Sequence, residues 1–293
     1  MQTSGQTIKE YYDNNTKHFL KYGEDAGTMS IHQPLWESND LQQAINYSNK
    51  LILTVLRNYS TQYNKTEINV LDLGCGVGSS LFYLAQHCDL KINLYGVSIS
   101  SAQIKIAKER SKELNLEQKC QFIESDFHHL SEQIPKIDIA FSIEAFVHAQ
   151  DASLFFQQIG SKLHQNGKLI LIDDFLVNNM DKKHLDRKFK KEIQNFKYGW
   201  MLGSLLSIKA IQDISSKASF SLETEKDLTF LLKINRIRDR FIRLYVKIAT
   251  GLFKNMPYFK SLIGGDSRQY CLENGLVQYK MIIFKKIHKK KST

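Results

Sequence analysis

An acid and three alternating glycines follow an apolar segment in the run Val70–Ser80. Gly74, Gly76 and Gly78 allow backbone dihedrals that side chains forbid, and they let a ligand approach the bare peptide. Asp72 stands where the apolar segment ends, so it would repel a pyrophosphate and suit a cation. The pattern predicts a strand, a tight turn and a helix start, with an ammonium or sulfonium ligand of nucleoside type at the turn.

The spacing of these glycines differs from that of dinucleotide-binding turns. In the dinucleotide fingerprint the second and third glycines are more widely spaced than the first and second, and a pyrophosphate sits over the helix start. Here each glycine follows the last by two residues. The spacing therefore favours a cationic ligand over NAD, and a glycine-rich turn of some other α/β protein is the alternative.

Strand-like and helix-like segments alternate along most of the chain. Such alternation predicts right-handed crossovers and a largely parallel sheet with helices on both faces. The expected helices are 8–22, 40–59, 79–88, 101–115 and 151–164, and the expected strands are 67–73, 91–97, 120–124, 136–143, 167–174, 219–223 and 277–284.

Polar residues close or follow five of the expected strands. Ligands of parallel α/β sheets bind beyond the carboxyl ends of the strands, which lie at one edge. We therefore expect these residues to surround one ligand site: Asp72, Ser98, Asp126, Glu144 and Asp174.

Glu144 and His148 lie four residues apart after the fourth expected strand. If residues 144–149 form a helical turn, both side chains face the same way, and each could act as a base or stabilise charge. A histidine titrates near neutrality, which suits removal of a proton from a hydroxyl or a methylated cation. Packing at a helix start is the alternative. Because neighbouring strand residues face opposite sides, only one of Asp173 and Asp174 is expected to face the pocket.

The run from Asp72 to Gly78, Asp-x-Gly-x-Gly-x-Gly after an apolar strand, resembles motif I of class I S-adenosylmethionine-dependent methyltransferases. The resemblance implies an α/β fold with a Rossmann-like seven-stranded sheet, mostly parallel with an antiparallel last strand, plus N-terminal helices and a helical cap. It also implies S-adenosyl-L-methionine as the cofactor and S-adenosyl-L-homocysteine as the product.

The second expected strand ends in Ser98, where most methyltransferases carry an acid that holds the ribose. The run 96–103 resembles instead a small-molecule group that includes cyclopropane fatty acid synthases and sterol, tocopherol and sugar methyltransferases. By that resemblance Ile99, Ser100 and Gln103 would surround the ribose and the methionine tail. A plain strand-to-helix cap is the alternative for each of them.

Two further segments resemble cofactor-binding parts of this family. Asp126 would accept a hydrogen bond from the adenine amine, and the neighbouring Phe127 would stack or fill space. Tyr11 and Tyr12 lie in the expected helix 8–22 and resemble a lid whose aromatic rings close over a sulfonium. Packing of the two tyrosines is the alternative.

The resemblance also assigns roles at the catalytic face. Related sugar and small-molecule enzymes keep Glu and His at the positions of Glu144 and His148. The counterpart of Asp174 in the resembling O-methyltransferases looks like a base or an orienting acid. His32 and Trp36 lie in a loop that resembles bacterial C-methyltransferases of prenylated natural products.

Aromatic and basic residues beyond residue 178 are expected to line the substrate site. A mostly helical insert, 178–218, carries Trp200, and a second insert, 230–270, carries Arg236 and Arg240 at helical spacing. These arginines could clamp a phosphate or diphosphate, and a solvated helix face is the alternative. The expected substrate contacts are His32, Trp36, Phe146, Phe175, Trp200, Arg236 and Arg240.

Length and cysteine use bound the class of protein. A chain of 293 residues can form one large α/β domain with an inserted cap. The expected parts are an N-terminal helical lid (1–64), a cofactor-binding core (65–177), the cap insert (178–218) and a last part (219–293) that ends the sheet. The four cysteines include no Cys-x-x-Cys pair, and no signal-like or membrane-spanning run is present. We expect a cytoplasmic protein with no integral membrane segment.

The formal charge of +10 gathers in the second half and ends in a lysine-rich tail, 285–291. Aromatic interleaving and a helix-turn-helix are both lacking, so nucleic acid is not an expected partner. His128 and His129 are adjacent and diverge, so no metal site is expected, and Mg²⁺ is expected only where the substrate carries a diphosphate. The N-terminal helix could reach a second copy of the chain.

Three hypotheses for function follow. The leading one is carbon methylation of an apolar prenyl or terpenoid compound, with cyclisation of the resulting cation as an extension, because the cap is rich in aromatic residues. The first alternative is O- or N-methylation of a natural product with His148 or Asp174 as base. The second is a non-catalytic or RNA-associated protein that kept the fold, which the basic tail motivates.

Overall fold

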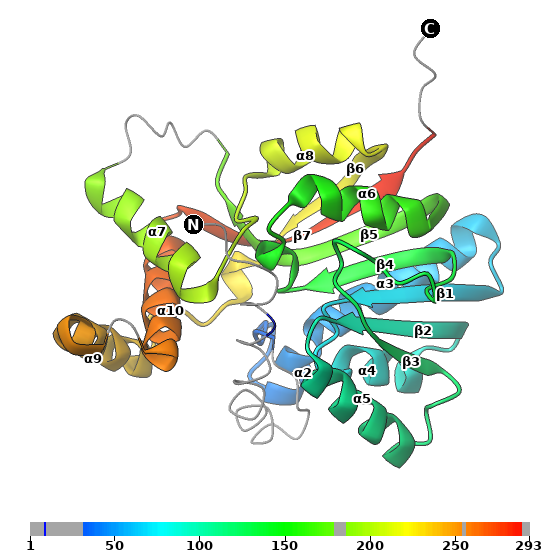
Figure 1. Ribbon diagram of the computed structural model, residues 1–293, viewed down its shortest axis with the longest axis horizontal. Helices are drawn as coiled ribbons and strands as arrows, with labels where there is room; N and C mark the ends of the chain where they lie inside the picture. The colour runs from blue at the N-terminus through cyan, green and yellow to red at the C-terminus, as the bar shows by residue number, and fades with distance from the viewer. Residues whose placement is uncertain (1–8, 10–31, 179–185, 254–255, 289–293) are drawn as a thin grey trace, which may run out of the picture.

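A single sheet organises the part of the chain that the computed structural model describes, residues 9, 32–178, 186–253 and 256–288. Within these residues seven strands lie in the order β3-β2-β1-β4-β5-β7-β6 (Figure 1). The strands are β1 (Glu67–Leu73), β2 (Lys91–Ser98), β3 (Cys120–Glu124), β4 (Ile137–Ile143), β5 (Leu163–Leu176), β6 (Phe220–Asp227) and β7 (Val277–Lys286).

The direction of the strands confirms the expected fold class. β1 pairs in parallel with β2 and β4, β2 with β3, and β4 with β5. β7 inserts between β5 and β6 and runs antiparallel to both. The carboxyl ends of the parallel strands therefore share one edge, and the start of β7 lies at that same edge.

Helices cover both faces of the sheet. On one face α3, α4 and α5 share an apolar cluster with β1 and β2, and on the other α6 and α8 share a second cluster with β4 and β5. The helices are α2 (Leu41–Ile45), α3 (Tyr47–Tyr63), α4 (Ser79–His87), α5 (Ser101–Glu113), α6 (Ala152–Lys162), α7 (Arg187–Trp200), α8 (Ile208–Lys217), α9 (Ile237–Phe253) and α10 (Pro257–Glu273), with short 3₁₀ turns η1 (Phe146–His148) and η2 (Thr229–Leu231).

The expected helix 40–59 is two helices in the structure. α2 and α3 separate at Asn46, whose backbone (φ −87°, ψ 4°) leaves the helical region, and α3 continues to Tyr63. Residues of α3 such as Ile52 and Leu56 are fully buried in the same cluster as β1. α3 is therefore a layer of the core, while the division into four parts stays a prediction.

Helices α7 and α10 pack side by side beyond the carboxyl edge of the sheet, and α9 lies outside α10 (Figure 1). Glycines allow the close approach of α7 and α10. A Cβ added at Gly264 would lie 2.4 Å from Cδ1 of Trp200 and 3.0 Å from the carbonyl carbon of Gly199. A side chain at residue 264 would therefore push the two helices apart.

This contact can be tested with two neighbouring substitutions in α10. We expect Gly264→Ala to lower the free energy of unfolding by about 1–3 kcal/mol, because overpacking forces the helices to shift. Gly265→Ala is the matched control, since its nearest neighbour would be Cζ2 of Trp200 at 3.9 Å. The control should leave the free energy of unfolding unchanged or raise it by up to about 1 kcal/mol, because alanine has a higher helix propensity than glycine. Urea melts of both variants measure the difference, and equal effects would contradict the packing described.

Candidate functional site

The glycine turn after β1 is held tightly between β2 and the loop after β4. Gly74, Gly76 and Gly78 all have positive φ, at +88°, +53° and +86°. The Gly74 N–H donates to the carbonyl oxygen of Val97 at 2.9 Å. A Cβ at Gly74 would lie only 2.5 Å from Cβ of Ala145, so no other residue fits there without movement.

Asp72 ends β1 as a buried carboxylate. No hydrogen bond or ion pair from the described residues reaches it, and burial raises its pKa well above the ordinary range. A buried acid without a compensating partner is costly for the folded protein, and a cation beside it would lower that cost. Asp72, beside the partly buried glycine turn, therefore fits a ligand with a positive charge, as S-adenosylmethionine has.

The residues after β2 form a hydrogen-bonded group of their own. Ser98 Oγ donates to Oε1 of Gln103 at 2.8 Å, and Ser100 Oγ caps α5 by accepting from the backbone N–H of Gln103 at 3.2 Å. These three side chains are buried, whereas Ile99 is half-buried. The structure shows the capping interaction for Ser100, and the contact of this group with a ribose stays a prediction.

Asp126 follows β3 and keeps one oxygen for a ligand. Its Oδ1 accepts hydrogen bonds from the backbone N–H of His128 at 2.8 Å and from Nδ1 of the same residue at 2.9 Å. Partial burial raises the pKa of Asp126, but the bonds from His128 outweigh it and leave the pKa lowered. No described residue donates to Oδ2, which fits the predicted adenine contact. Phe127 packs edge-on against Phe155, with ring centroids 5.4 Å apart.

The predicted lid residues Tyr11 and Tyr12 lie outside the described residues. Lys9 is described, and its Nζ forms an ion pair with Glu124 at the end of β3. The chain at residue 9 therefore reaches the edge of the sheet where the adenine contact is predicted.

A buried ionic cluster lies at the ends of β4 and β5. The hydroxyl of Tyr279, at the start of β7, donates to Oε1 of Glu144 at 2.7 Å, and the backbone N–H of Gln33 donates to the same oxygen at 2.8 Å. Arg268 of α10 is only 3% exposed and donates two hydrogen bonds to Asp174. Its Nε donates to Oδ2 at 2.5 Å, and its Nη2 donates to Oδ1 at 3.1 Å. Five segments distant in sequence thus meet at one site.

Burial sets the electrostatics of this cluster. It raises the pKa of Glu144, while Arg268 and the bonds from Gln33 and Tyr279 oppose the rise. The pKa of Tyr279 is well above its ordinary range because of burial and the nearby Glu144, so the phenol stays a donor. Burial would lower the pKa of Arg268, but Asp174 and Glu144 outweigh it, so the guanidinium stays charged.

Residues 144–149 do not form one helical turn, which is the condition under which Glu144 and His148 would face the same way. The 3₁₀ turn η1 begins at Phe146, and Glu144 precedes it in the left-handed region, with φ +52°. Such backbone is strained for a residue with a side chain and persists only when the surroundings hold it. Hydrogen bonds to Oε1 fix the direction of the Glu144 side chain. Its position relative to His148 therefore does not follow from helical spacing.

Asp173 and Asp174 turn to different partners, as expected of neighbouring strand residues. Asp173 Oδ2 accepts from the backbone N–H of Val147 at 3.1 Å, and burial followed by the charge of Asp174 raises the pKa of Asp173 well above its ordinary range. Asp173 thereby fixes the start of η1, and Asp174 joins Arg268.

Two partly buried histidines stay neutral at pH 7. Burial lowers the pKa of His148 to about 4, opposed by hydrogen bonds to the backbone of Met201 and Trp200. His32 has a pKa of about 4 for the same reason, opposed by the backbone of Gln33. By geometric criteria neither ring nitrogen of His32 bonds to a described residue.

The aromatic residues predicted to contact substrate fall in different places. Phe146 and Phe175 are fully buried in the cluster under α6 and α8, so packing accounts for both. Trp200 lies at the α7–α10 contact and donates from Nε1 to the carbonyl oxygen of Ser261 at 3.1 Å, with Arg268 5.6 Å from its ring centroid. Trp200 therefore borders the ionic cluster.

The remaining predicted substrate residues lie away from that cluster or have partners of their own. Trp36 holds Nζ of Lys233 at 3.3 Å from its ring centroid. Arg236 bonds to Asp239 at 3.1 Å, and Arg240 to Asn235 at 3.2 Å. The phosphate clamp therefore stays a prediction. These contacts show that the start of α9 is partly exposed to solvent.

Sequence reasoning missed Arg268 and Tyr279. A signal existed for Tyr279, because an antiparallel last strand begins at the edge where the parallel strands end. For Arg268 the sequence carries no comparable signal, since one arginine in a helical segment is ordinary.

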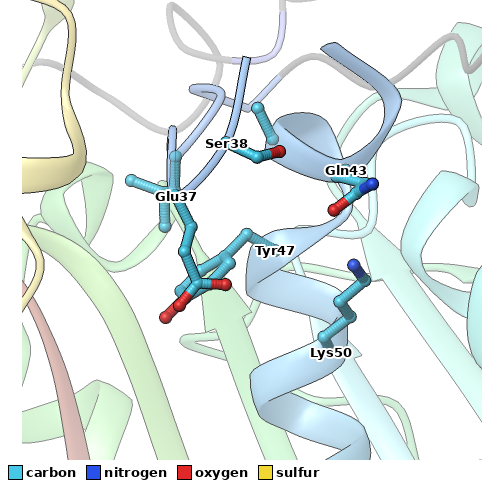
Figure 2. Close-up of a pocket in the computed structure, with 7 residues that line it drawn as sticks. Glu37, Ser38, Gln43, Tyr47 and Lys50 are labelled. Atoms are coloured by element: carbon cyan, nitrogen blue, oxygen red, sulfur yellow. The ribbon is translucent and has the colours of Figure 1, made fainter. Parts of the chain in front are cut away.

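A separate shallow hollow, whose cavity volume is only about 10 Å³, lies between the loop after Leu35 and helices α2 and α3 (Figure 2). Figure 2 shows Glu37, Ser38, Gln43, Tyr47 and Lys50 around it, and none of the predicted site residues lines it. Ligand pockets for small molecules are usually about 300–1,000 Å³. The hollow is therefore too small to hold a nucleoside cofactor.

The described part of the chain offers neither a cluster of metal ligands nor a membrane-spanning helix. The described ranges hold no group of three or more His, Cys, Asp or Glu side chains placed to bind a metal ion. Nor does any helix in the described part of the chain combine the length and apolar character needed to cross a bilayer.

A family model described as a methyltransferase domain matches residues 64–227. The matched range includes β1 to β6 and so contains the glycine turn, Asp126 and Glu144. The chain belongs to the methyltransferase domain family. This membership confirms the family expected from the motif that begins at Asp72.

Relatives of this methyltransferase domain come from two comparisons. The chain is 28% identical over 159 residues to the 24-methylenesterol C-methyltransferase 3 of Arabidopsis thaliana, a match that covers 54% of this chain but only 43% of that protein. A geranyl diphosphate C-methyltransferase from Streptomyces coelicolor A3(2) superposes with a TM-score of 0.70 at 14% identity, covering 98% and 100% of the two chains. A cyclopropane synthase from Mycobacterium tuberculosis gives 0.70 at 16% identity, covering 98% and 99%. The two structures show a shared fold.

The depressed pKa of His148 makes stability depend on pH. Between its ordinary value of 6.5 and about 4, the unfolded chain binds a proton that the folded protein does not, so stability falls as the pH drops through that window. When the pH falls from about 7.5 to about 5, we expect the free energy of unfolding to drop by about 1–2 kcal/mol less in His148→Gln than in the parent protein. Denaturant melts at both pH values measure this, with exposed His87→Gln as control. An unchanged pH dependence in His148→Gln would contradict the burial of a neutral imidazole.

Proposed function

We propose that the protein transfers a methyl group from S-adenosylmethionine to a carbon atom of an apolar small molecule of the prenyl, terpenoid or sterol class. The observation that carries the proposal is Glu144. It is a partly buried carboxylate at the carboxyl edge of the sheet, held at one oxygen by Tyr279 and Gln33. The adjoining loop residue, Ala145, packs directly against the glycine turn.

The cofactor contacts follow from the site. When bound, S-adenosylmethionine supplies an electrophilic methyl group on a positively charged sulfur. Asp72 would stabilise the positive charge of the ligand, and the turn from Gly74 to Gly78 would present its backbone. Oδ2 of Asp126 would accept from the adenine amine, and Ser98 with Gln103 would border the ribose.

Carbon methylation needs a base more than it needs an activated nucleophile. The electron pair of an acceptor double bond forms the new carbon–carbon bond as the sulfur–methyl bond breaks, which leaves a positive charge on the acceptor. Loss of a proton to a carboxylate restores a double bond. Glu144 Oε2 receives no hydrogen bond from the described residues, and burial raises the basicity of the group. Cyclisation of the cation before proton loss is an alternative fate within the same proposal.

The class of acceptor rests on the surroundings of Glu144. The Arg268 guanidinium beside this site lies over the rings of Trp200 and Tyr279, 5.6 and 5.8 Å from their centroids, and aromatic faces stabilise nearby positive charge. The names of the relatives, a sterol C-methyltransferase and a geranyl diphosphate C-methyltransferase, support the same class. Mg²⁺ would be needed only by an acceptor that carries a diphosphate.

A second candidate function is O- or N-methylation of a natural product. It is favoured by His148, which is neutral at pH 7 and so able to accept a proton from a hydroxyl or an amine. The two candidates share the cofactor and differ in the atom that receives the methyl group.

The position of the transferred methyl group tests the proposal. Protein is incubated with S-adenosylmethionine labelled in its methyl group and with a panel of prenyl alcohols, prenyl diphosphates with Mg²⁺, and sterols, and the products are read by mass spectrometry and NMR. We expect label on carbon. Label on oxygen or nitrogen selects the second candidate, and failure to bind S-adenosylhomocysteine would refute both.

Substitutions at Glu144 and Tyr279 test the assigned roles. We expect Glu144→Gln to lower kcat about 10²–10⁴-fold with S-adenosylhomocysteine affinity retained, since a base is lost and the cofactor turn is not. Exposed Glu117→Gln is the matched control. Tyr279→Phe removes a bond that lowers the pKa of Glu144, so the acidic limb of the pH–rate profile should move to higher pH. A profile unmoved in Tyr279→Phe would argue against Glu144 as the base.

A further inference from the structure

Helix α9 exposes a continuous apolar face. Ile237 and Ile248 are 75% and 73% exposed, and Phe241 is 67% exposed. Large apolar side chains recur at positions that share one face of a helix. The apolar face of α9 consists of Ile237, Phe241, Leu244, Tyr245 and Ile248.

The opposite face of α9 fixes the helix to the protein. Val246 is buried against Phe259 and Ile263 of α10. Arg243 joins the same seam by pairing with Asp266 at 2.9 Å and Glu273 at 3.3 Å. The helix therefore has a packed side and an exposed side, and its apolar face is not a loosely placed segment. Figure 1 shows α9 at the outer edge of the molecule, with α10 between it and the sheet.

Basic residues border the apolar face. On a helical projection Arg238 lies along one border, and Arg240 and Lys247 lie along the other, all three exposed. Asp239 is the one acid between Arg236 and Ile248, and it is buried and paired with Arg236 at 3.1 Å and with Arg238 at 3.7 Å. The exposed surface of this stretch is therefore apolar in the middle and positive at both borders.

We propose that α9 is an interfacial helix that docks the protein on an anionic phospholipid bilayer. A helix with an apolar face flanked by Lys and Arg lies in the headgroup region, with its apolar side chains in the acyl boundary and its cations at lipid phosphates. Phe230 of η2, 77% exposed, adds one apolar side chain on a neighbouring element. The proposal does not depend on the proposed methyl transfer.

Charge favours an anionic bilayer over a second copy of the chain as the partner of the apolar face of α9. Two copies joined through α9 would bring their basic borders together without an exposed acid on the face to neutralise them. A lipid surface supplies the phosphates that these borders lack. A docked α9 would also place α10, which carries Arg268, directly behind the bilayer contact.

Vesicle flotation with the full chain tests the proposal. We expect the protein to float with phosphatidylcholine vesicles that contain about a third phosphatidylglycerol, and to bind pure phosphatidylcholine at least about tenfold more weakly. The double variant Phe241→Gln/Ile248→Gln should lose at least about tenfold in anionic-vesicle binding, because the inserted area is removed. Arg238→Gln/Lys247→Gln should lose about tenfold and show a weaker salt dependence.

The matched control is Leu41→Gln/Leu114→Gln, which changes two exposed apolar residues, one on α2 and one at the C-terminal end of α5. It should bind vesicles as the parent does, and thermal melts should show all variants folded. The proposal is overturned if the parent binds no vesicle, if both double Gln variants of α9 bind as the parent does, or if the control loses binding equally. A dimer in analytical ultracentrifugation that Phe241→Gln/Ile248→Gln abolishes would overturn it as well, because a second copy would then cover the face.

Discussion

The close contact between Gly74 and Ala145 is the constraint on which the site depends. It brings the glycine turn after β1 against the residue that follows Glu144, and the 2.5 Å left for a Cβ shows that only a glycine allows this approach. The turn is further fixed by the N–H groups of Gly74 and Cys75, which both donate to Val97 at 2.9 Å. The predicted methyl donor site and the proposed base are thus parts of one packed unit.

A second constraint is electrostatic. Glu144, Asp173 and Asp174 gather at the ends of β4 and β5, and the buried Arg268 pairs with Asp174 and lies near Glu144. A buried ion pair adds little net stability, but removal of one partner leaves an uncompensated charge. The pair of Asp174 with Arg268 therefore ties α10, and through it α7 and α9, to the edge of the sheet. The backbone N–H groups bound by Asp173 and Glu144 then set the loop around η1.

Much of this arrangement could be predicted from the sequence, because local signals agreed. β1 begins at Glu67 and ends at Leu73 as expected, since a buried apolar run is bounded by an acid and by glycines. Ser100 and Asp151 cap α5 and α6 close to the expected starts. The strand-end rule located Asp72, Asp126 and Glu144 at one edge.

The rest could not be predicted because it depends on tertiary contacts. Arg268 reaches the site only through the packing of α10 on α7, which two glycines allow. The left-handed backbone of Glu144 overrides the helical spacing to His148, because bonds from Gln33 and Tyr279 hold its side chain. The apolar face of α9 could not be predicted, because only the burial of its residues shows which side of the helix packs on α10.

The central claim is that a positively charged donor binds at the turn whose position Gly74 determines. Calorimetric titration of S-adenosylhomocysteine, the demethylated form of that donor, into Gly74→Ala tests this most directly. Gly275→Ala is the matched control, because its φ of +63° carries similar backbone strain with no neighbour within 4 Å. The account predicts binding by the parent and by Gly275→Ala, and a loss of at least about tenfold, or 1.4 kcal/mol, in folded Gly74→Ala. Equal affinities for all three, or no binding by the parent, would contradict it.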